Sequence, residues 1–278
     1  MGNDNNLRKL QLTELDILKS VVEICEKENI RYYLLGGTFL GAVRHKGFIP
    51  WDDDIDIGMP RPDYDRFFDK GSKMLTEKYI YKNYWKGNER TICFSRVEDK
   101  SIMIIDRSGI KEKNRFAWID IFPLDGMPNS AFARKVHQIH LLYRKALMQY
   151  SQFSTIVNQD LHNRPLYEKI LIFLGKLINT EKVLDADKCL TKLNQVMRQY
   201  PYESAKYVVN FLGAYKFKEM FPKAVYDDVD TYDFEDIALP APRNYDLVLS
   251  QLYGDYMELP PENRRNKHHT EIIIPSGK

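Results

Sequence analysis

The segment Trp-Asp-Asp-Asp-Ile-Asp-Ile-Gly, residues 51–58, constrains the fold of this chain more than any other. It places four carboxylates within five positions, and like charges this close repel one another and raise each other's pKa. In a solvated loop that repulsion costs little, so an acidic surface loop is one interpretation. The neighbouring tryptophan and isoleucines favour partial burial instead, and the alternation of aspartate with isoleucine predicts a half-buried strand over 53–58.

The alternation also suggests a metal site, because it would point Asp54 and Asp56 to the same side of that strand, about 6.5–7 Å apart. A hard divalent cation is the usual partner of two such carboxylates. Mg²⁺ in particular is bound by one or two carboxylates together with substrate phosphates. We therefore predict a cofactor site on Asp54 and Asp56 that holds Mg²⁺, or Mn²⁺ in its place.

A Gly-Gly-Thr turn at residues 36–38 precedes the acidic segment. It ends a short apolar run and opens a predicted helix over 38–44, where Gly36 and Gly37 leave backbone N–H groups accessible to a ligand. A helix N-terminus favours phosphate, and Thr38 would add a hydroxyl donor. Most Gly-Gly pairs only turn the chain. Here the turn and the carboxylate strand follow one another in one αβ unit, which predicts phosphate donors beside metal ligands.

Asp120 lies at the centre of the apolar sequence Trp-Ile-Asp-Ile-Phe, within a predicted strand over 117–122. An isolated charge in such a strand is costly. One interpretation is an aspartate at the strand end that caps the next turn. The other is a third acid facing the metal pair, which would complete the metal site or accept a proton from an attacking hydroxyl. Residues 123–126, Pro-Leu-Asp-Gly, are predicted to form a turn.

Two groups of basic residues are candidates for phosphate binding. The first lies between the glycine turn and the acidic segment and consists of Arg44, His45 and Lys46. Its position favours contact with phosphate oxygens over a solvated charge run. The second follows two adjacent prolines near the C-terminus and includes Arg264, His268 and His269. A loop folded over an anionic ligand fits this pattern better than a zinc site, because no cysteine or aspartate lies at ligand spacing nearby.

The order of the predicted elements indicates an α+β fold, with a mixed sheet core flanked by helices. Helices are predicted over 12–29, 38–44, 63–74, 131–150, 165–199 and 244–253. Strands are predicted over 53–58, 79–84, 92–97, 101–106, 117–122, 206–212 and 234–239. The chain is thus divided into a catalytic core over 1–130, a helical insertion over 131–200, and a segment over 201–278 that returns to the core and closes the active site.

Composition and charge argue against several classes of protein. A net charge of +2 over 278 residues argues against nucleic-acid binding, which predicts a more basic chain. The three cysteines are far apart and odd in number, which predicts reduced thiols in a cytoplasmic protein. The N-terminus lacks the apolar core of a signal peptide, and no stretch approaches the ~20 apolar residues of a membrane span. The apolar residues 166–178, with two lysines, are either a core helix or an interfacial helix that would make peripheral contact with the inner face of the cell membrane.

Residues 35–59, from Leu-Gly-Gly-Thr to Ile-Asp-Ile-Gly-Met, closely resemble the signature of the LicD family. This family comprises phosphocholine transferases and relatives within the nucleotidyltransferase superfamily. The resemblance continues at 119–126, 234–246 and 253–262 and closes with the histidine pair, so it spans the chain. The helical middle is its least distinctive part. The resemblance implies that the sheet core is nucleotidyltransferase-like.

The resemblance also implies a mechanism. A CDP-activated alcohol, typically CDP-choline, would bind with its phosphates over Gly37 and Thr38. Mg²⁺ on Asp54 and Asp56 would bridge the diphosphate and stabilise charge on the leaving CMP. Asp120 would accept the proton of a sugar hydroxyl that attacks the choline-bearing phosphorus. The acceptor would be a cell-surface glycan, such as a lipid-linked teichoic acid precursor.

Two other hypotheses compete with this one. The first is another reaction of the nucleotidyltransferase fold, such as ribitol-phosphate or nucleotidyl transfer; choline and ribitol donors share the same diphosphate chemistry. The second is a non-catalytic relative that binds glycan or lipid. The complete set of Asp54, Asp56 and Asp120 argues against the second, because an inactive copy has no reason to keep the costly Asp120.

Overall fold

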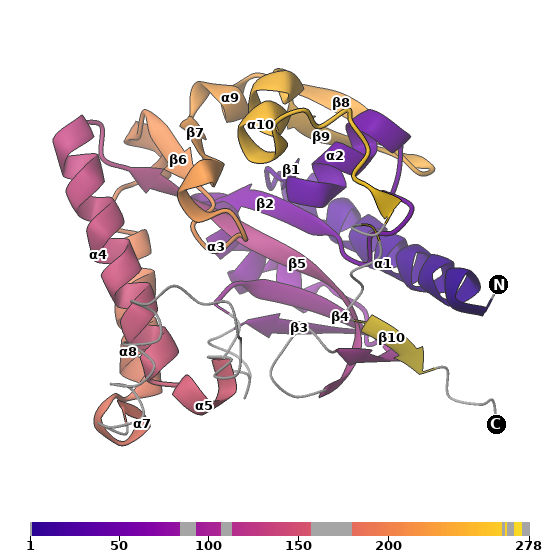
Figure 1. Ribbon diagram of the computed structural model, residues 1–278, viewed down its shortest axis with the longest axis horizontal. Coiled ribbons are helices and arrows are strands. Elements are labelled where there is room, and N and C mark those ends of the chain that lie inside the picture. Colours follow the sequence, from indigo (N-terminus) through magenta and orange to yellow (C-terminus); the bar gives the residue numbers. More distant parts are fainter. Residues whose placement is uncertain are drawn as a thin grey trace.

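The computed structural model describes residues 2–83, 93–106, 113–156, 180–262, 265 and 270–273. A mixed sheet of eight strands runs through the centre, and helices flank it (Figure 1). The path β1-β2-β5-β4-β10 forms its main part, β3 pairs with β4, and β6 joins β5 to β7. Within this sheet β2 and β5 are parallel, and the other pairs are antiparallel. The predicted α+β class with a mixed sheet and flanking helices is confirmed.

The strands have the following bounds: β1 (Tyr33–Leu34), β2 (Asp56–Pro60), β3 (Tyr79–Asn83), β4 (Ser95–Asp106), β5 (Lys113–Met127), β6 (Tyr207–Val209), β7 (Met220–Pro222) and β10 (Thr270–Ile273). A separate hairpin consists of β8 (Val229–Phe234) and β9 (Ile237–Pro242). The helices are α1 (Gly2–Lys27), α2 (Gly36–His45), α3 (Arg61–Asp69), α4 (Ala131–Tyr150), α5 (Phe153–Ile156), α7 (Thr180–Val183), α8 (Ala186–Met197), α9 (Ala224–Asp227) and α10 (Tyr245–Tyr253). Short 3-10 turns are η1 (Gly71–Lys73), η2 (Tyr202–Ser204) and η3 (Lys216–Glu219).

The main core lies between the central strands and the helices that precede them. Ile57, Ile119 and Ile121 of β2 and β5 are fully buried, and Leu18 and Cys25 of α1 pack in the same cluster. This burial follows from the apolar periodicity of α1 and from the alternation of aspartate with isoleucine in the strands. A second cluster joins α4, α8 and β6 through Leu141, Leu193, Val209 and their neighbours. The proposed boundaries at 130 and 200 stay a prediction.

Several predicted elements differ from the structure in informative ways. The predicted turn over 123–126 is wrong: β5 continues to Met127, because β6 pairs with its last three residues and Arg61 neutralises Asp125. The predicted strands over 92–97 and 101–106 form one strand, β4, whose register shifts between Asp99 and Met103. The predicted strand over 234–239 spans the turn of the β8–β9 hairpin, where Glu235 has a φ of +57°. The part of the predicted helix before residue 180 lies outside the described residues, together with most of 166–178.

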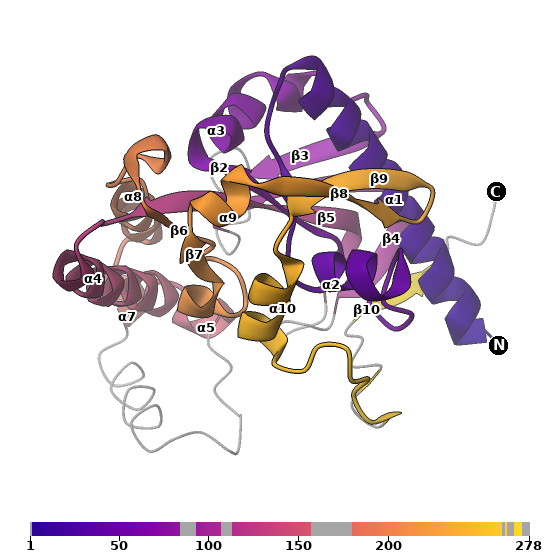
Figure 2. The ribbon, with the colours of Figure 1, turned by 90° about the horizontal axis from the view of Figure 1, so that it is seen from above.

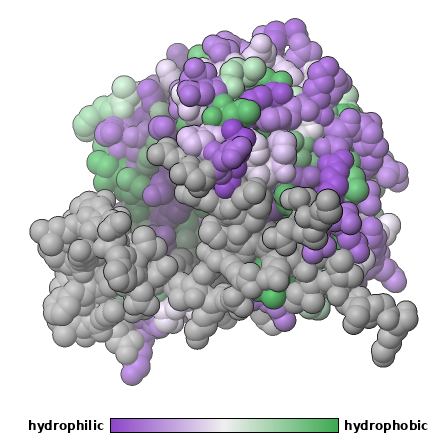
Figure 3. Space-filling model, turned by 45° about the vertical axis from the view of Figure 1, so that its right-hand side comes forward, coloured by the Kyte–Doolittle hydropathy of each residue, from purple (hydrophilic) through white to green (hydrophobic). Residues whose placement is uncertain are grey.

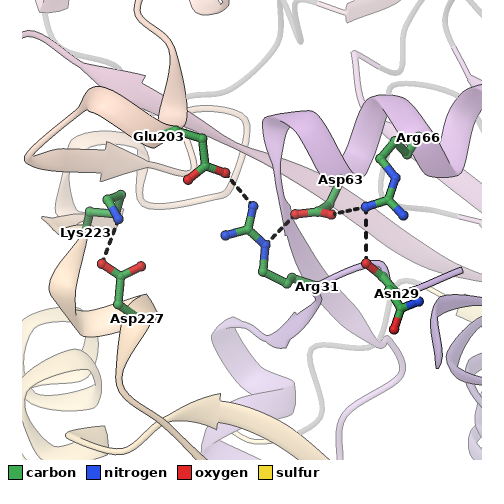
Figure 4. Close-up of polar contacts among 7 residues, drawn as sticks. All are labelled: Asn29, Arg31, Asp63, Arg66, Glu203, Lys223 and Asp227. Atoms are coloured by element: carbon green, nitrogen blue, oxygen red, sulfur yellow. Dashed lines mark hydrogen bonds and ion pairs between the residues drawn. The ribbon is translucent and has the colours of Figure 1, made fainter.

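The C-terminal third of the chain returns to the first elements and is fastened there by ion pairs. Arg31, which precedes β1, donates to Asp63 of α3 and to Glu203 of η2, each at 2.6 Å (Figure 4). The view from above shows α10 beside α2 (Figure 2), and the β8–β9 hairpin packs against α2 and β1. Residues far apart in the sequence therefore meet around the start of α2, where the candidate site lies.

Candidate active site

The parallel pairing of β2 with β5 brings two predicted site residues together. Asp56 is the first residue of β2 and is in register with Asp120 of β5, so both side chains point to the same face of the sheet. Asp54 does not lie in the strand as predicted but in the extended segment just before it, and it is exposed to solvent. The three acids thus meet at the end of the sheet where β2 begins.

A pocket of about 290 Å³ opens over this end of the sheet. One side is formed by the glycine turn and the acidic segment, through Gly36, Gly37, Asp52, Asp54 and Asp56. The other side comes from residues more than 150 positions later, and includes Asn210, Gly213, Tyr215, Glu219 and Tyr253. None of this second group was predicted from the sequence to belong to the site.

Desolvation and mutual repulsion raise the pKa of two carboxyl groups of the pocket, Asp54 and Asp56. Desolvation is the first cause that raises the pKa of Asp54 well above its usual range, and repulsion from Asp52, Asp53 and Asp120 follows. Because Asp54 still reaches solvent, we give the repulsion more weight for this residue. For Asp56 desolvation again comes first, followed by repulsion from Asp54. A bound cation would remove this repulsion, so the cluster has the electrostatics of a cation site.

Asp120 is held in a different way from the other two acids. Its carboxylate accepts two hydrogen bonds from the Arg96 guanidinium of β4, at 2.6 and 3.0 Å, and one from the Trp118 indole at 3.3 Å. The guanidinium also lies 4.1 Å from the centre of the Trp118 ring. The arginine therefore neutralises Asp120 inside the fold, and the interpretation of Asp120 as a cap at a strand end is wrong because the residue lies in mid-strand.

The glycine turn shapes the floor of the pocket. Gly36 has a φ of +50°, a conformation that favours glycine, and it opens α2 without a side-chain cap. A Cβ on Gly37 would lie 2.7 Å from Oδ2 of Asp52, so any side chain there would displace that carboxylate. Thr38 is buried, and its hydroxyl accepts a hydrogen bond from the backbone N–H of Asp56 at 2.8 Å. Thr38 thus joins the start of α2 to the start of β2.

Glu219 is the acid that sequence reasoning missed. It ends η3, is buried, and accepts hydrogen bonds from the Asn210 amide at 2.7 Å and from the Tyr215 backbone N–H at 3.1 Å. Burial raises its pKa to about 7, and the two hydrogen bonds oppose that rise. No local pattern marks Glu219, because η3 and β7 reach the pocket only through pairing with β6.

A second missed acid, Glu14, comes from α1. It is buried, and its Oε2 has no hydrogen-bond partner in the part of the chain that the structure describes. Burial raises its pKa well above the usual range, and repulsion from Asp54, Asp53 and Asp52 adds to the effect. The helical pattern of α1 places residue 14 beside the apolar positions, so the sequence could have indicated that Glu14 is buried.

The structure places the predicted basic residues in different surroundings. Arg44 donates to the Tyr256 carbonyl at 2.6 Å and to His45 Nε2 at 2.9 Å, and it lines a neighbouring groove. Desolvation and the nearby Arg44 charge lower the pKa of His45, which favours its neutral form. Lys46 is 78% exposed and faces Asp233 at 3.7 Å, so it is turned toward the β8–β9 hairpin. Arg264, His268 and His269 lie outside the described residues.

The neighbouring groove shares Leu40, Ile49 and Tyr253 with the pocket and has a volume of about 620 Å³. Its other lining residues include two aromatic side chains, Trp51 and Tyr256, and two acids, Asp255 and Glu258. The Arg265 guanidinium lies 4.9 Å from the centre of the Trp51 ring. Aromatic faces and acids are groups that bind cations, and an arginine already lies over one of these rings.

The donor set fits a hard divalent cation. Within the described ranges, no group of three or more His, Cys, Asp or Glu side chains is arranged to hold a metal ion, and Asp120 is engaged by Arg96. Mg²⁺ does not require three, because it binds through one or two carboxylates and completes its shell with water and substrate phosphate oxygens. Asp54 and Asp56 satisfy that requirement, and desolvation together with repulsion from neighbouring carboxylates raises the pKa of both.

The chain is similar to several known proteins. Residues 29–153 match the family model described as LicD/FKTN/FKRP, nucleotidyltransferase domain. The chain is 32% identical over 274 residues to the lipopolysaccharide cholinephosphotransferase LicD of Haemophilus influenzae, covering 95% of this chain and 96% of the relative. It is 29% identical over 108 residues to the human ribitol 5-phosphate transferase FKRP, covering 36% of this chain and 21% of that protein. An uncharacterized protein of Rickettsia prowazekii is 32% identical over 124 residues, 45% of this chain and 43% of that protein.

Proposed function

The chain belongs to the LicD family, and from this premise we propose that it transfers phosphocholine from CDP-choline to a sugar hydroxyl of a lipid-linked cell-surface glycan, releasing CMP. The chain is a phosphotransferase. The observation that supports the proposal most is the pocket itself, in which the carboxyls of Asp54 and Asp56 face the glycine turn that opens α2. An acceptor of the lipopolysaccharide or teichoic acid type would place the reaction at the inner face of a membrane.

The two sides of the pocket suit the diphosphate of such a donor. Gly36 and Gly37 present backbone N–H groups at the N-terminus of a helix of 10 residues, an arrangement that favours phosphate. Asp54 and Asp56 would hold Mg²⁺, which when bound supplies positive charge to the diphosphate and the leaving CMP. Thr38 keeps the glycine turn and Asp56 in a fixed relation through its hydrogen bond.

We assign the proton of the attacking hydroxyl to Glu219 rather than to Asp120. The sugar oxygen forms a bond to the choline-bearing phosphorus, the bond from that phosphorus to the CMP oxygen breaks, and the hydroxyl proton passes to a carboxylate. Asp120 already binds Arg96 through both carboxylate oxygens. Glu219 faces the pocket, is oriented by Asn210, and has a pKa of about 7, which suits a general base near neutral pH.

The neighbouring groove favours choline over ribitol as the transferred alcohol. A trimethylammonium group is attracted to aromatic faces and to acids, and the groove offers Tyr256, Asp255 and Glu258 beside the pocket, together with Trp51, whose ring a choline cation would share with Arg265. Ribitol carries no charge and gains nothing from these groups beyond hydrogen bonds. The cholinephosphotransferase of Haemophilus influenzae also aligns with this chain over far more of its length than the ribitol 5-phosphate transferase does.

The test is release of CMP over a panel of donors: CDP-choline, CDP-ribitol, CDP-glycerol and CDP-ethanolamine, with a lipid-linked glycan extract as acceptor. We expect CDP-choline to give the highest kcat/KM, and a chelator to abolish release until Mg²⁺ or Mn²⁺ is added back. The Asp233→Ala variant is the matched control, because this exposed aspartate makes only a surface contact with Lys46. CMP release from none of these donors would refute the proposal, and a preference for CDP-ribitol would reassign the alcohol.

A further inference from the structure

The outer face of α4 is apolar. Among the residues that the structure describes, this helix exposes five large hydrophobic side chains: Phe132, Val136, Ile139, Leu142 and Tyr143. They recur at intervals of three or four residues, with the last two adjacent, so they share one side of the helix. Phe132 is 81% exposed and Ile139 is 61% exposed. A helix of 20 residues is roughly 30 Å long, and this stripe covers its first three turns.

The opposite face of α4 is the one that attaches the helix to the protein. His137, Leu141 and Met148 are buried, and the last two pack with residues of α8 and β6 in the second core cluster. The His137 ring meets Tyr200 at a centroid distance of 4.8 Å. Among the described residues, the helix is therefore packed through one face, and the apolar stripe lies outside that packing.

The stripe stands apart from the rest of the described surface. The other exposed large hydrophobic residues in the described ranges lie on several elements: Leu12, Val183, Tyr215, Tyr245, Leu247, Met257 and Leu259. On the face shown in Figure 3, the coloured surface at the top and right is mostly hydrophilic, with hydrophobic residues in small groups. Single exposed apolar residues are ordinary, whereas a contiguous apolar face marks an interaction site.

The charges of α4 indicate which partner this face fits. The helix contains Arg134, Lys135, Arg144 and Lys145 and has no aspartate or glutamate. Lys135 is exposed beside the apolar stripe, and the Arg144 guanidinium lies 5.3 Å from the Tyr143 ring. A second copy docked through the same face would bring these cations together. An anionic lipid surface instead attracts them while its acyl region accepts the apolar side chains.

We propose that α4 docks on an anionic lipid surface, with its apolar stripe at the boundary between head groups and acyl chains and with Lys135 and Arg144 at the head groups. Among the described residues, no helix is long and apolar enough to cross a membrane. The contact would therefore be parallel to the surface. This membrane contact depends on α4 alone and not on the transfer reaction. Because α4 and β6 share a core cluster, the contact would also bring the pocket close to a lipid-linked acceptor.

Co-sedimentation with vesicles tests this directly. We expect the full chain to bind vesicles of phosphatidylglycerol and phosphatidylcholine, and to bind pure phosphatidylcholine at least about tenfold more weakly. Combined Phe132→Ser, Val136→Ser and Ile139→Ser substitutions should weaken binding at least about tenfold. Leu247→Ser, which removes an exposed leucine from α10, should bind like wild type. Lys135→Glu should weaken binding to anionic vesicles, whereas Lys27→Glu at the end of α1 should not.

Three results would overturn the proposal. The first is no binding to anionic vesicles by the wild-type chain. The second is unchanged binding by the triple variant while its circular dichroism and melting temperature match wild type. The third is a wild-type dimer, seen by light scattering, that the triple substitution converts to a monomer, since the face would then be an interface between two copies. CMP release measured on a soluble glycan acceptor is expected to be unaffected by the triple substitution, so failure here is distinguishable from failure of the proposed reaction.

Discussion

The two ends of the β2–β5 strand pair differ in whether a basic side chain compensates their carboxylates. At the end where the parallel strands finish, Asp125 is buried and receives two hydrogen bonds from Arg61, at 2.6 and 2.7 Å. At the end where they begin, Asp54 and Asp56 repel each other, and in the described part of the chain neither forms an ion pair with a basic side chain. Both ends belong to the same sheet and use the same residue type.

The difference separates a structural acid from a functional one. A buried charge is tolerated when the fold supplies its partner, and breaking such a pair leaves an uncompensated charge. A cluster without a partner raises the free energy of the empty protein and is relieved only by a cation from outside. Asp120 lies between the two cases, because it is beside Asp56 but is neutralised by Arg96.

The largest effect is expected at the end of the strand pair that carries Asp54 and Asp56. Asp56→Asn should lower kcat/KM for CDP-choline at least about 10⁴-fold, because it removes one of the two proposed cation ligands, a loss of more than about 5 kcal/mol in the transition state. The metal-free variant should melt at or above the wild-type temperature, since one of the repelling charges is gone. Steady-state CMP release and differential scanning calorimetry measure the two quantities. If Asp56→Asn lost both activity and stability, Asp56 would not differ from a structural acid such as Asp125.

At the other end of the strand pair, where Asp125 binds Arg61, a substitution should change stability instead of activity. Arg61→Ala leaves Asp125 buried without its partner, and we expect it to lower the free energy of unfolding by about 3–5 kcal/mol. Arg198→Ala is the matched control, because it removes a comparable arginine from the more exposed pair with Asp65 and should cost about 1 kcal/mol or less. Urea denaturation followed by circular dichroism gives both values. Equal losses in the two variants would contradict the assignment of Asp125 as a structural acid.

Glu219 and Asp120 can be separated by their pH profiles. Glu219→Gln should lower kcat about 10²–10⁴-fold and remove the acidic limb of the kcat/KM profile near pH 7, because the base that must be deprotonated is gone. Asp120→Asn should lower stability, since it leaves Arg96 buried with a weakened partner, but should keep that limb. An acidic limb that disappears in Asp120→Asn and persists in Glu219→Gln would show that Asp120, and not Glu219, accepts the proton.

The smallest effect is the pH dependence of the metal-free protein. The folded-state pKa of Glu219 is raised to about 7, so its contribution to stability is present below the unfolded-state pKa of about 4.3 and is lost as pH rises through about 7. Asp54 and Asp56 shift in the same direction. We expect the free energy of unfolding to fall by on the order of 3 kcal/mol between pH 4.5 and 7.5. Added Mg²⁺ should reverse the fall, and an Asp56→Asn variant should show a weaker reversal; a flat profile would show that the cluster is already compensated.

Much of the site was predictable because its first half is local in the sequence. Asp54 and Asp56 are two positions apart, the glycine turn lies shortly before them, and the alternation correctly placed Asp56 on a strand, although Asp54 lies just before it. The α+β class and the apolar face of α1 follow from the same short-range patterns. The long match over residues 35–59 indicated the LicD family, and the similarity to the cholinephosphotransferase confirms that family.

The partners of these residues could not be predicted, because they depend on pairing between distant strands. Nothing near Asp125 in the sequence shows that Arg61 will neutralise it, so Pro-Leu-Asp-Gly was predicted to be a turn and is a strand. Likewise Arg96 meets Asp120 only through the register of β4 with β5.

The sequence by itself determined the carboxylate pair, the glycine turn and the family, since these depend on short-range spacing and on residue type. Tertiary structure alone decided which acids are compensated. It neutralised Asp120 and Asp125 with arginines, and it brought Glu219 into the pocket through η3 and β6. The physical reason is that the energy of a carboxylate is set by the charges and the solvent around it. In a folded chain those neighbours come from segments whose distance in sequence carries no information about their distance in space.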